Sequence, residues 1–334
     1  MVDHALEPFE LLQSGKTDVI FASRQKEPKC EWIPLYHELL YAILPKQYPL
    51  NGRKEFPLRE FEGKDYKISK NKTRDIIFTT LLYLIIIFVF VVIGSFVYYA
   101  FIDNFIINKS FSLKHFEYVL SNDIGKYILN SLLIAVSVAV IGTFITYFTA
   151  YATARIKGKI AKLIHILTIS SLAIPGIVLG LSYTISFSNS FIYNTFIIMI
   201  IVNIIHFMAS PYLMAYNALL KINPNYEVVA KTCDISTFRI IKDVIIPCSK
   251  ITIREMIAYF FINSMVTISA VTFLFNTDTM PLSLMINTYE GNMMLGEAAI
   301  VSLIILFFNL IVKGSIYLIN RKEDRKKWNY EVNI

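Results

Sequence analysis

Long runs without a charged side chain dominate the middle and the end of the chain. Asp, Glu, Lys and Arg are absent from Ile76–Ile102, Tyr127–Ala154 and Met256–Phe275. Each run reaches the roughly 20 apolar residues that a helix needs to cross the hydrocarbon layer. A longer uncharged run, Leu163–Leu220, must fold back once, and residues 186–190 are its only polar break long enough for a turn. The pattern therefore predicts six membrane spans, at 76–102, 127–154, 163–185, 191–218, 256–275 and 298–320.

These spans divide the chain into membrane and water-exposed parts. Residues 1–75 form an N-terminal extension and linker, and residues 76–320 form the transmembrane domain. A charged stretch, 219–255, interrupts this domain between its fourth and fifth spans, and residues 321–334 form a tail. Helices satisfy all their backbone polar groups internally, as lipid requires. The expected fold class is therefore an all-α membrane protein with six transmembrane helices.

Composition agrees with this class. Hydrophobic residues make up 55% of the 334 residues, charged residues only 17%, and the mean hydropathy is +0.53. Soluble domains carry about 25% charged residues. The chain is therefore too apolar for a soluble domain of its length.

Lysine and arginine are concentrated in alternate loops. They gather before the first span, between the second and third spans, within 219–255 and in the tail, whereas 186–190 and 276–297 hold none. Loops that face the cytoplasm carry the excess of Lys and Arg. Both termini and 219–255 are therefore expected in the cytoplasm. The net charge of +7 reflects this topology and attraction to lipid headgroups, and a nucleic-acid partner is not expected.

The N-terminal extension holds two features of its own. Glu31–Leu44 has an apolar face but is too short to span. It either lies on the membrane surface or the helical bundle, or belongs to a separate domain core. Ser14–Thr17 resembles the end of a phosphate-binding loop, but Glu10 stands where that loop needs a glycine, so a chance match is expected. No other Gly-Lys-Ser/Thr occurs, and any ATP hydrolysis is expected on another chain.

The cysteines Cys30, Cys233 and Cys248 all fall on the predicted cytoplasmic side. Thiols stay reduced there, so no disulfide framework is expected. The sequence shows no metal-ligand cage and no cofactor motif. The first span is expected to serve as the insertion signal because the N-terminus lacks the pattern of a cleaved signal peptide.

The charged stretch between the fourth and fifth spans contains helix signals. Asn223 can cap free backbone amides, and Pro224 suits a helix start. Helix-compatible residues run to Thr232, and a bend is expected at Cys233–Ile235. The stretch therefore begins with a short helix that ends in a turn.

A second short helix is expected after that bend. Ser236 supplies its cap, and Phe238, Ile241 and Ile245 recur at spacings that place them on one face. Pro247 is expected to stop the helix. An amphipathic helix of this kind either inserts into a groove on a partner or lies among the lipid headgroups.

The same stretch resembles the EAA loop of permease subunits of binding-protein-dependent ABC importers. Asn225–Ala230 followed by Ile245–Pro247 is similar to the family pattern of Glu-Ala-Ala, a glycine and a distant proline. With Pro247 as the anchor, Asp234 stands at the family glycine, and Glu227 lies one residue before the family glutamate. Asp tolerates the left-handed backbone that the glycine adopts.

Other segments resemble this family in the same order, over about residues 60–322. They are Phe61–Lys64 before the first span, Asn130–Leu132 with Ala150–Arg155, Ile174–Leu181, Ser269–Phe275, Pro281 and Gly296–Ala299. Ser269–Phe275, with Pro281 and Gly296–Ala299, resembles the subgroup that moves ferric iron, 2-aminoethylphosphonate, thiamine or polyamines.

The resemblance implies the fold and function of the chain. The fold would be a MetI-like ABC-importer permease bundle in the bacterial inner membrane, and the function would be ATP-driven import, of ferric iron or an organophosphonate-like solute. The implied partners are cytoplasmic ABC ATPase subunits, a second permease half, an extracytoplasmic substrate-binding protein and the lipid bilayer. The chain itself would not be an enzyme. The residues implied to contact the ATPase are Glu227, Ala230, Asp234, Ser236, Phe238, Arg239, Ile241 and Pro247, with Phe238 and Ile241 filling the partner's groove.

Polar residues within the spans point to a solute path. The candidates are Ser170, Ser171, Asn203, His206, Asn263, Ser264 and Ser269. Such side chains also commonly bridge helices, so each has a structural alternative. Two rival functions stay open: a membrane-anchored sensor or structural subunit, and a secondary transporter. The latter is disfavoured because no Asp or Glu lies inside any predicted span.

Overall fold

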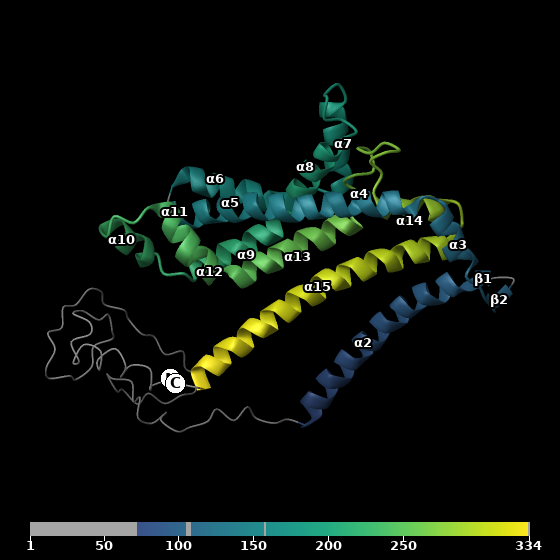
Figure 1. Ribbon diagram of the computed structural model, residues 1–334, viewed down its shortest axis with the longest axis horizontal. Coiled ribbons are helices and arrows are strands. Elements are labelled where there is room, and N and C mark those ends of the chain that lie inside the picture. Colours follow the sequence, from purple (N-terminus) through teal and green to yellow (C-terminus); the bar gives the residue numbers. More distant parts are fainter. Residues whose placement is uncertain (1–71, 105–107, 157, 333–334) are drawn as a thin grey trace. The chain divides into compact units, whose positions relative to one another are not determined.

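The computed structural model describes residues 72–104, 108–156 and 158–332 (Figure 1). Helices form nearly all of the described chain, which agrees with the expected all-α class. The features predicted at Glu31–Leu44, Ser14–Thr17 and Phe61–Lys64 lie outside the described residues, as does Cys30.

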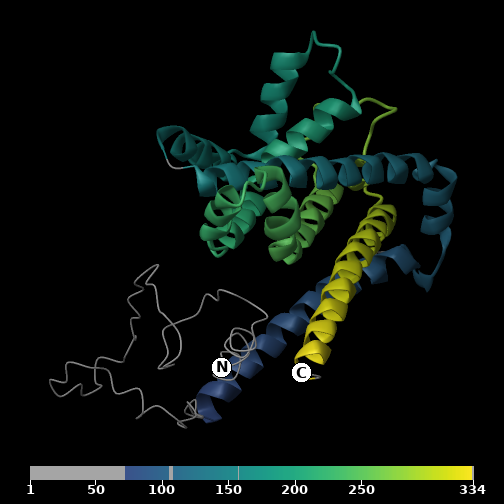
Figure 2. The same cartoon turned by 60° about the vertical axis from the view of Figure 1, so that its left-hand side comes forward.

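The first described helix, α2, is Lys72–Phe101, and its apolar window has no share buried inside the protein. The C-terminal end of α2 approaches α15 (Leu295–Val332) (Figures 1 and 2). A helix that is hydrophobic all round and unburied suits a lipid environment. A two-stranded antiparallel ribbon follows, with β1 Ile102–Asn104 paired to β2 Asn108–Phe111. The short helix α3, Lys114–Ser121, then turns the chain back to the bundle.

The next span runs without a break over Ile124–Arg155. It consists of α4 (Ile124–Ser137), a π-helical turn (Val138–Gly142) and α5 (Thr143–Arg155). A Cβ placed on Gly142 would lie 3.2 Å from the ring of Phe260. The glycine therefore lets this span pack closely against α13.

Two predicted spans are bent helix pairs. α6 (Lys159–Ser170), with its 3₁₀ turn to residue 173, meets α7 (Gly176–Phe187) at 109°. The span expected at 163–185 is therefore not one straight helix. The cause is Pro175: it lacks an N–H group and pushes the residue before it, Ile174, into an extended conformation. α7 accordingly stands across the line of α4 and α5 (Figures 1 and 2).

The second bent pair has a similar cause. α8 (Phe196–Phe207) and α9 (Ala209–Leu220) meet at 55°. Pro211, in the first turn of α9, cannot donate a backbone hydrogen bond to Phe207, and its ring crowds that carbonyl. The chain between α7 and α8, residues 188–195, forms turns (the 188–195 connection).

The span expected at 256–275 differs most from the prediction. α13 covers Lys250–Val266 and ends there, and residues 267–281 are not helical. α14 (Leu282–Gly291) and α15 complete the described chain. In the described part, three helices are long and apolar enough to span, or up to five if each bent pair counts as one span. The expected count of six is not confirmed, because α13 has only 17 residues and an absence of charge cannot distinguish helix from irregular apolar chain.

Two hydrophobic clusters hold the bundle together. The larger one gathers buried side chains mainly of α4, α8, α13, α14 and α15. The smaller one joins α5, α9 and α13 around Tyr147, Tyr212 and Met256, and includes Ile245 from the chain before α13. The side chain of Ile245 thus anchors the predicted cytoplasmic stretch in the core.

Candidate coupling surface and translocation path

The first short helix of the charged stretch is α10, Asn225–Thr232. Its start matches the prediction, because the backbone N–H of Asn225 donates to the side-chain oxygen of Asn223 over 2.9 Å. Its end also matches: Asp234 has a left-handed backbone with φ of 56°. Ile235 N–H donates to Ala230 O over 2.8 Å and Asp234 N–H to Lys231 O over 3.2 Å. These two bonds form the Schellman motif that normally uses glycine, so Asp234 produces the expected bend.

The second short helix begins as predicted but continues differently. The Ser236 side chain accepts from the Arg239 backbone N–H, so it caps α11, Thr237–Ile240. A π-helical turn, Ile241–Ile245, follows and leads into α12, Ile246–Cys248. Pro247 was expected to end the helix, but it lies inside α12, and Ser249 separates α12 from α13.

Phe238 does not share the buried face of Ile241 and Ile245. Phe238 is 75% exposed, whereas Ile241 is 9% exposed and Ile245 is fully buried. Ile241 and Ile245 are the first and last residues of the π-helical turn. Ile241 was expected to fill a partner's groove together with Phe238, but its side chain is buried within the chain. Ala230 is buried as well.

Five large apolar side chains of this loop are exposed. We call this set the coupling surface: Tyr226, Val228, Val229, Ile235 and Phe238. Beside it, Arg239 pairs with Asp243 one turn later at 3.5 Å, and both side chains are exposed. Exposed apolar side chains outside the predicted spans indicate a surface that a partner or the lipid headgroups can cover.

Glu227 was expected to contact a partner, and its carboxylate pairs within the chain. Arg155, the last residue of α5, donates from Nε to Glu227 Oε1 over 2.8 Å and from Nη2 to Ile222 O over 3.1 Å. Both charged side chains are largely buried. The pair fixes α10 to the C-terminal end of the α4–α5 span, so Glu227 positions the helix that carries part of the coupling surface.

Buried hydroxyls continue this connection into the smaller cluster. Tyr147 OH lies 2.6 Å from Ser249 Oγ, and Ser249 in turn donates to Ile245 O over 2.8 Å. Because the single Ser249 proton goes to Ile245, Tyr147 is the donor to Ser249. Tyr212 OH similarly lies 2.7 Å from Thr153 Oγ1 and 2.7 Å from His165 Nδ1. These bonds tie α5, α6, α9 and the loop before α13 into one unit.

The predicted path residues fall into two groups. Four of them bond to the backbone of their own helix: Ser170 to Leu167, Ser171 to Thr168, Asn203 to Met199 and Asn263 to Tyr259. The structure brings His206 and Ser269 together at the start of α7. A Cβ on Gly176 would meet Ser269 Oγ and would lie 3.0 Å from His206 Nε2. Gly176 therefore permits this close approach.

Several buried polar atoms lack a hydrogen-bond partner among the described residues. They include Asn203 Oδ1, Ser264 Oγ and His206 Nδ1, which were predicted, and the hydroxyls of Thr143 and Thr146, which were not. Hydroxyls that face a bundle interior without such a bond are available to water or solute. Sequence reading missed the two threonines because Thr inside a helix usually bonds to the preceding turn.

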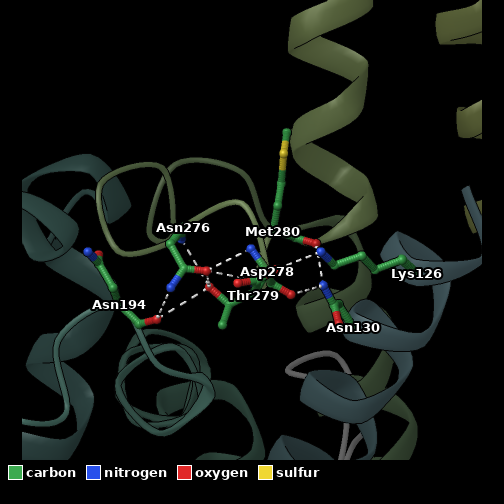
Figure 3. A network of polar contacts seen from close by, with 7 residues as sticks. All are labelled: Lys126, Asn130, Asn194, Asn276, Asp278, Thr279 and Met280. Carbon is green, nitrogen blue, oxygen red and sulfur yellow. Dashed lines mark hydrogen bonds and ion pairs between the residues drawn. The ribbon is translucent and has the colours of Figure 1, made fainter. Parts of the chain in front are cut away.

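A polar network near the N-terminal end of α4 was also not predicted as a site. Figure 3 shows Lys126 and Asn130 of α4 facing Asp278 and Met280, while Asn276 and Thr279 face Asn194. Asn276 Oδ1 accepts from the backbone N–H groups of Asp278 and Thr279 over 2.8 and 2.9 Å. The only sequence signal for this network is the Asn130-Ser131 pair, which lies in one of the segments that resemble the family.

Within residues 72–104, 108–156 and 158–332, no three His, Cys, Asp or Glu side chains gather as metal ligands. Outside the spans, the hydrogen bond from Lys114 lowers the pKa of Asp103, and the hydrogen bond from Lys126 lowers the pKa of Asp278. Both carboxylates therefore stay charged well below neutral pH.

A family model described as binding-protein-dependent transport system inner membrane component matches residues 142–325. Two curated relatives are ferric transport system permease proteins. FbpB 1 of Haemophilus influenzae is 26% identical over 200 residues, which cover 58% of this chain and 32% of the relative. FbpB of Actinobacillus pleuropneumoniae is 25% identical over 241 residues, which cover 68% and 35%. The chain thus spans about a third of the length of these relatives.

Solved structures give the same fold. A bacterial ABC transporter that imports the acidic polysaccharide alginate has a chain with TM-score 0.58 and 15% identity, over 76% of this chain and 96% of that one. A bacterial alginate ABC transporter, in complex with its periplasmic protein bound to an alginate pentasaccharide, gives TM-score 0.61 and 16% identity, over 75% and 96%. Identity at this level supports a shared fold alone.

Proposed function

The chain belongs to the family of binding-protein-dependent transport system inner membrane components, and from this we propose that it is the translocation subunit of an ATP-driven solute importer. One observation carries the proposal. Between two sets of spans, the chain presents the bent pair α10–α11 with an exposed apolar surface, while Arg155, Glu227 and Ile245 fix that pair to the bundle. A force applied to the coupling surface is therefore transmitted to the spans.

The partners follow from this role. Cytoplasmic ABC ATPase subunits would dock on the coupling surface, with Phe238 as the groove-filling anchor and Arg239 beside it. ATP-driven closure of the ATPases would rock the bundle between two states, because packed interfaces switch between discrete arrangements. A second permease half, identical or different, would complete the path. An extracytoplasmic binding protein would deliver the solute, and the ATP hydrolysis would occur on the ATPase subunits.

Ferric iron is the solute that the similar proteins favour, since both curated relatives are named as ferric transport permeases. An organophosphonate-like solute is the alternative. His206, Ser269 and the start of α7 are the part of the path that we assign to solute contact, together with Asn203 Oδ1 and Ser264 Oγ, which have no hydrogen-bond partner among the described residues. Both termini would face the cytoplasm, which the distribution of Lys and Arg supports.

Two measurements test this proposal. The tagged chain is purified from its native membrane, and the proteins that accompany it are identified. An ABC ATPase is the expected companion, and its absence would contradict the importer and favour a sensor or structural subunit. Cells with and without the gene are then compared for uptake of radioactive iron supplied as ferric citrate. Equal uptake would contradict iron as the solute, while leaving an ATP-driven importer of another solute in place.

A further inference from the structure

The irregular chain between α13 and α14, residues 267–281 (the 267–281 segment), bridges two walls of the bundle. α13 has 17 residues, and the first six, Lys250–Glu255, belong to the charged stretch 219–255. At about 1.5 Å per residue, the rest of the helix covers only about 16 Å of a hydrocarbon layer about 30 Å thick. The 267–281 segment therefore begins near the middle of the membrane. Non-helical backbone at that depth is tolerated only where it is buried in protein or lines a water-filled cavity. Its attachments consequently matter for the path.

On one side, the segment is attached to α4 by short bonds from buried side chains. Asn130 Nδ2 donates to Asp278 O over 2.8 Å and to Met280 O over 3.0 Å. Ser131 Oγ accepts from the Leu282 N–H over 2.7 Å, just past the end of the segment. Lys126 adds an ion pair to Asp278 at 2.7 Å. Asn130 and Ser131 are both buried, so separation would leave their polar atoms without partners.

On the other side, the segment is attached to α7 and the 188–195 connection by longer and more exposed bonds. Asn276 Nδ2 donates to Asn194 O over 3.1 Å, and Thr279 Oγ1 lies 3.5 Å from the same oxygen. Phe273 O accepts from Thr184 Oγ1 over 3.2 Å and from Tyr193 OH over 3.4 Å. Figure 3 shows Asn276 and Thr279 between Asn194 and the α4 side.

The donors on this second side have alternatives. Thr184 Oγ1 also reaches Gly180 O over 3.0 Å, and Thr279 Oγ1 also reaches Asn276 Oδ1 over 3.1 Å. The exposed groups can exchange their present partners for water. Breaking a buried bond leaves a group unsatisfied and costs about 1–3 kcal/mol, whereas a bond exchanged for water costs little. The two sides of the segment therefore differ in how easily they separate.

We propose that the 267–281 segment moves with α4, and that its outer part, residues 273–279, separates from the 188–195 connection when the path opens to the outside. Asn130 and Ser131 are then positioning residues that keep the segment on α4, and the Asn276–Asn194 contact is the one that opens. The inner end keeps its contact with α7. A Cβ on Gly180 would lie 2.6 Å from Ala270 O, so the two backbones already touch without an intervening side chain and can rotate against each other.

This inference rests on the proposed function, because it assumes an ATP-driven change of access. The test uses the full chain in its assembled complex in native membranes, with Cys30, Cys233 and Cys248 replaced by serine. One variant carries Asn194→Cys with Asn276→Cys, and the matched variant carries Lys126→Cys with Asp278→Cys. A short, reducible bifunctional methanethiosulfonate links each pair. The ATP hydrolysis of each variant before the reagent is added is the reference for its ATP hydrolysis afterwards.

The first readout is the yield of the link with the complex at rest and after trapping with ATP and vanadate. The 194–276 yield is expected to fall about tenfold on trapping, while the 126–278 yield stays within about twofold. A fall in the 126–278 yield, or no change in either yield, overturns the inference. The second readout is ATP hydrolysis. The 194–276 link is expected to block it until reductant is added, whereas the 126–278 link leaves it largely unchanged.

The outcomes also separate this inference from the proposed function. If the membranes show vanadate-sensitive ATP hydrolysis that depends on the chain, the importer stands, and the pattern of the two links alone decides the inference. Blockage by both links, or by the 126–278 link alone, overturns it. If no such hydrolysis accompanies the chain, the importer proposal fails, and the inference fails with it.

Discussion

Arg155 and Glu227 form a largely buried ion pair, with Nε and Oε1 2.8 Å apart, although 71 residues separate them in the sequence. The guanidinium uses a second nitrogen to hold the Ile222 carbonyl at 3.1 Å. The pair therefore fixes the beginning of the coupling loop to the end of α5. It also explains why a glutamate is useful in this loop without touching a partner.

Removal of either charge is expected to destabilise the chain. Arg155→Ala leaves the Glu227 carboxylate without its partner, and Glu227→Gln leaves the Arg155 charge unpaired, each at a cost of about 1–3 kcal/mol. The double variant should be no less stable than the worse single variant, because the interaction is lost only once. The midpoint of thermal unfolding in detergent measures all three. Fully additive losses would show that the two side chains do not act as a pair, and Lys231→Ala on the exposed side of α10 serves as the control.

Phe238 and Ile241 are expected to behave in opposite ways. Phe238→Ala with Arg239→Glu changes exposed side chains, so stability should change by less than about 0.5 kcal/mol while the ATPase no longer co-purifies. Ile241→Ala removes a buried side chain and should cost about 2–5 kcal/mol. Co-purification and thermal unfolding are measured together. If the variant with Phe238→Ala and Arg239→Glu inserts into the membrane and still retains the ATPase, this result would contradict docking at the coupling surface.

Gly296 lies directly against His115, so Gly296→Ala is expected to disturb the start of α15. A Cβ there would lie 2.5 Å from Cδ2 of the His115 ring, which itself sits 2.9 Å from Glu297 Oε1 and 2.9 Å from Ile102 O. Forcing a methyl group into this contact should cost about 1–3 kcal/mol.

The matched control is Gly314→Ala on the same helix, where a Cβ meets nothing within 4 Å. That change should be neutral or stabilise by up to about 1 kcal/mol, because alanine favours helix. Equal effects of the two substitutions on thermal unfolding would contradict the close contact with His115.

Tyr147→Phe is expected to loosen the joint between α5 and the coupling loop. The variant keeps the ring but removes the proton that Tyr147 donates to Ser249 Oγ over 2.6 Å. One buried hydrogen bond is worth about 1 kcal/mol net. Tyr216→Phe, at a ring stacked on Tyr212, is the control and should have a smaller effect. Unfolding midpoints measure both, and an unchanged Tyr147 variant would contradict a structural role for this bond.

Acidification is expected to weaken the Lys126–Asp278 attachment. The hydrogen bond from Lys126 lowers the pKa of Asp278 in the folded protein below its ordinary value of about 3.9. The pair thus adds stability at pH values above about 4, and this stability is lost as the pH falls through the lowered pKa. The difference in unfolding midpoint between the wild type and Asp278→Asn should be constant from pH 7 to pH 5 and should shrink below pH 4. A difference that grows on acidification would contradict this assignment.

Local signals predicted the coupling loop well because they act over a few residues. Asn223, Asp234 and Ser236 each take part in a backbone hydrogen bond within four positions, so the sequence sufficed to place the first short helix, the bend and the start of the second helix. The same reasoning did not predict the π-helical turn after Ile240 or the burial of Ile241, because neither has a signal in the residue types. It also failed at 267–275, where an uncharged run is irregular chain fixed by α4 and α7.

The sequence by itself determined the membrane class and the positions of most apolar helices, and its motifs pointed to the family, because hydrophobic length and local capping depend on near neighbours only. Tertiary structure decided which side chains meet. The pairing of Arg155 with Glu227, the approach of Ser269 and His206 at Gly176, and the attachment of the 267–281 segment to Asn130 all join residues far apart in the chain. Such contacts depend on how bent helices pack in three dimensions, and no local pattern encodes them.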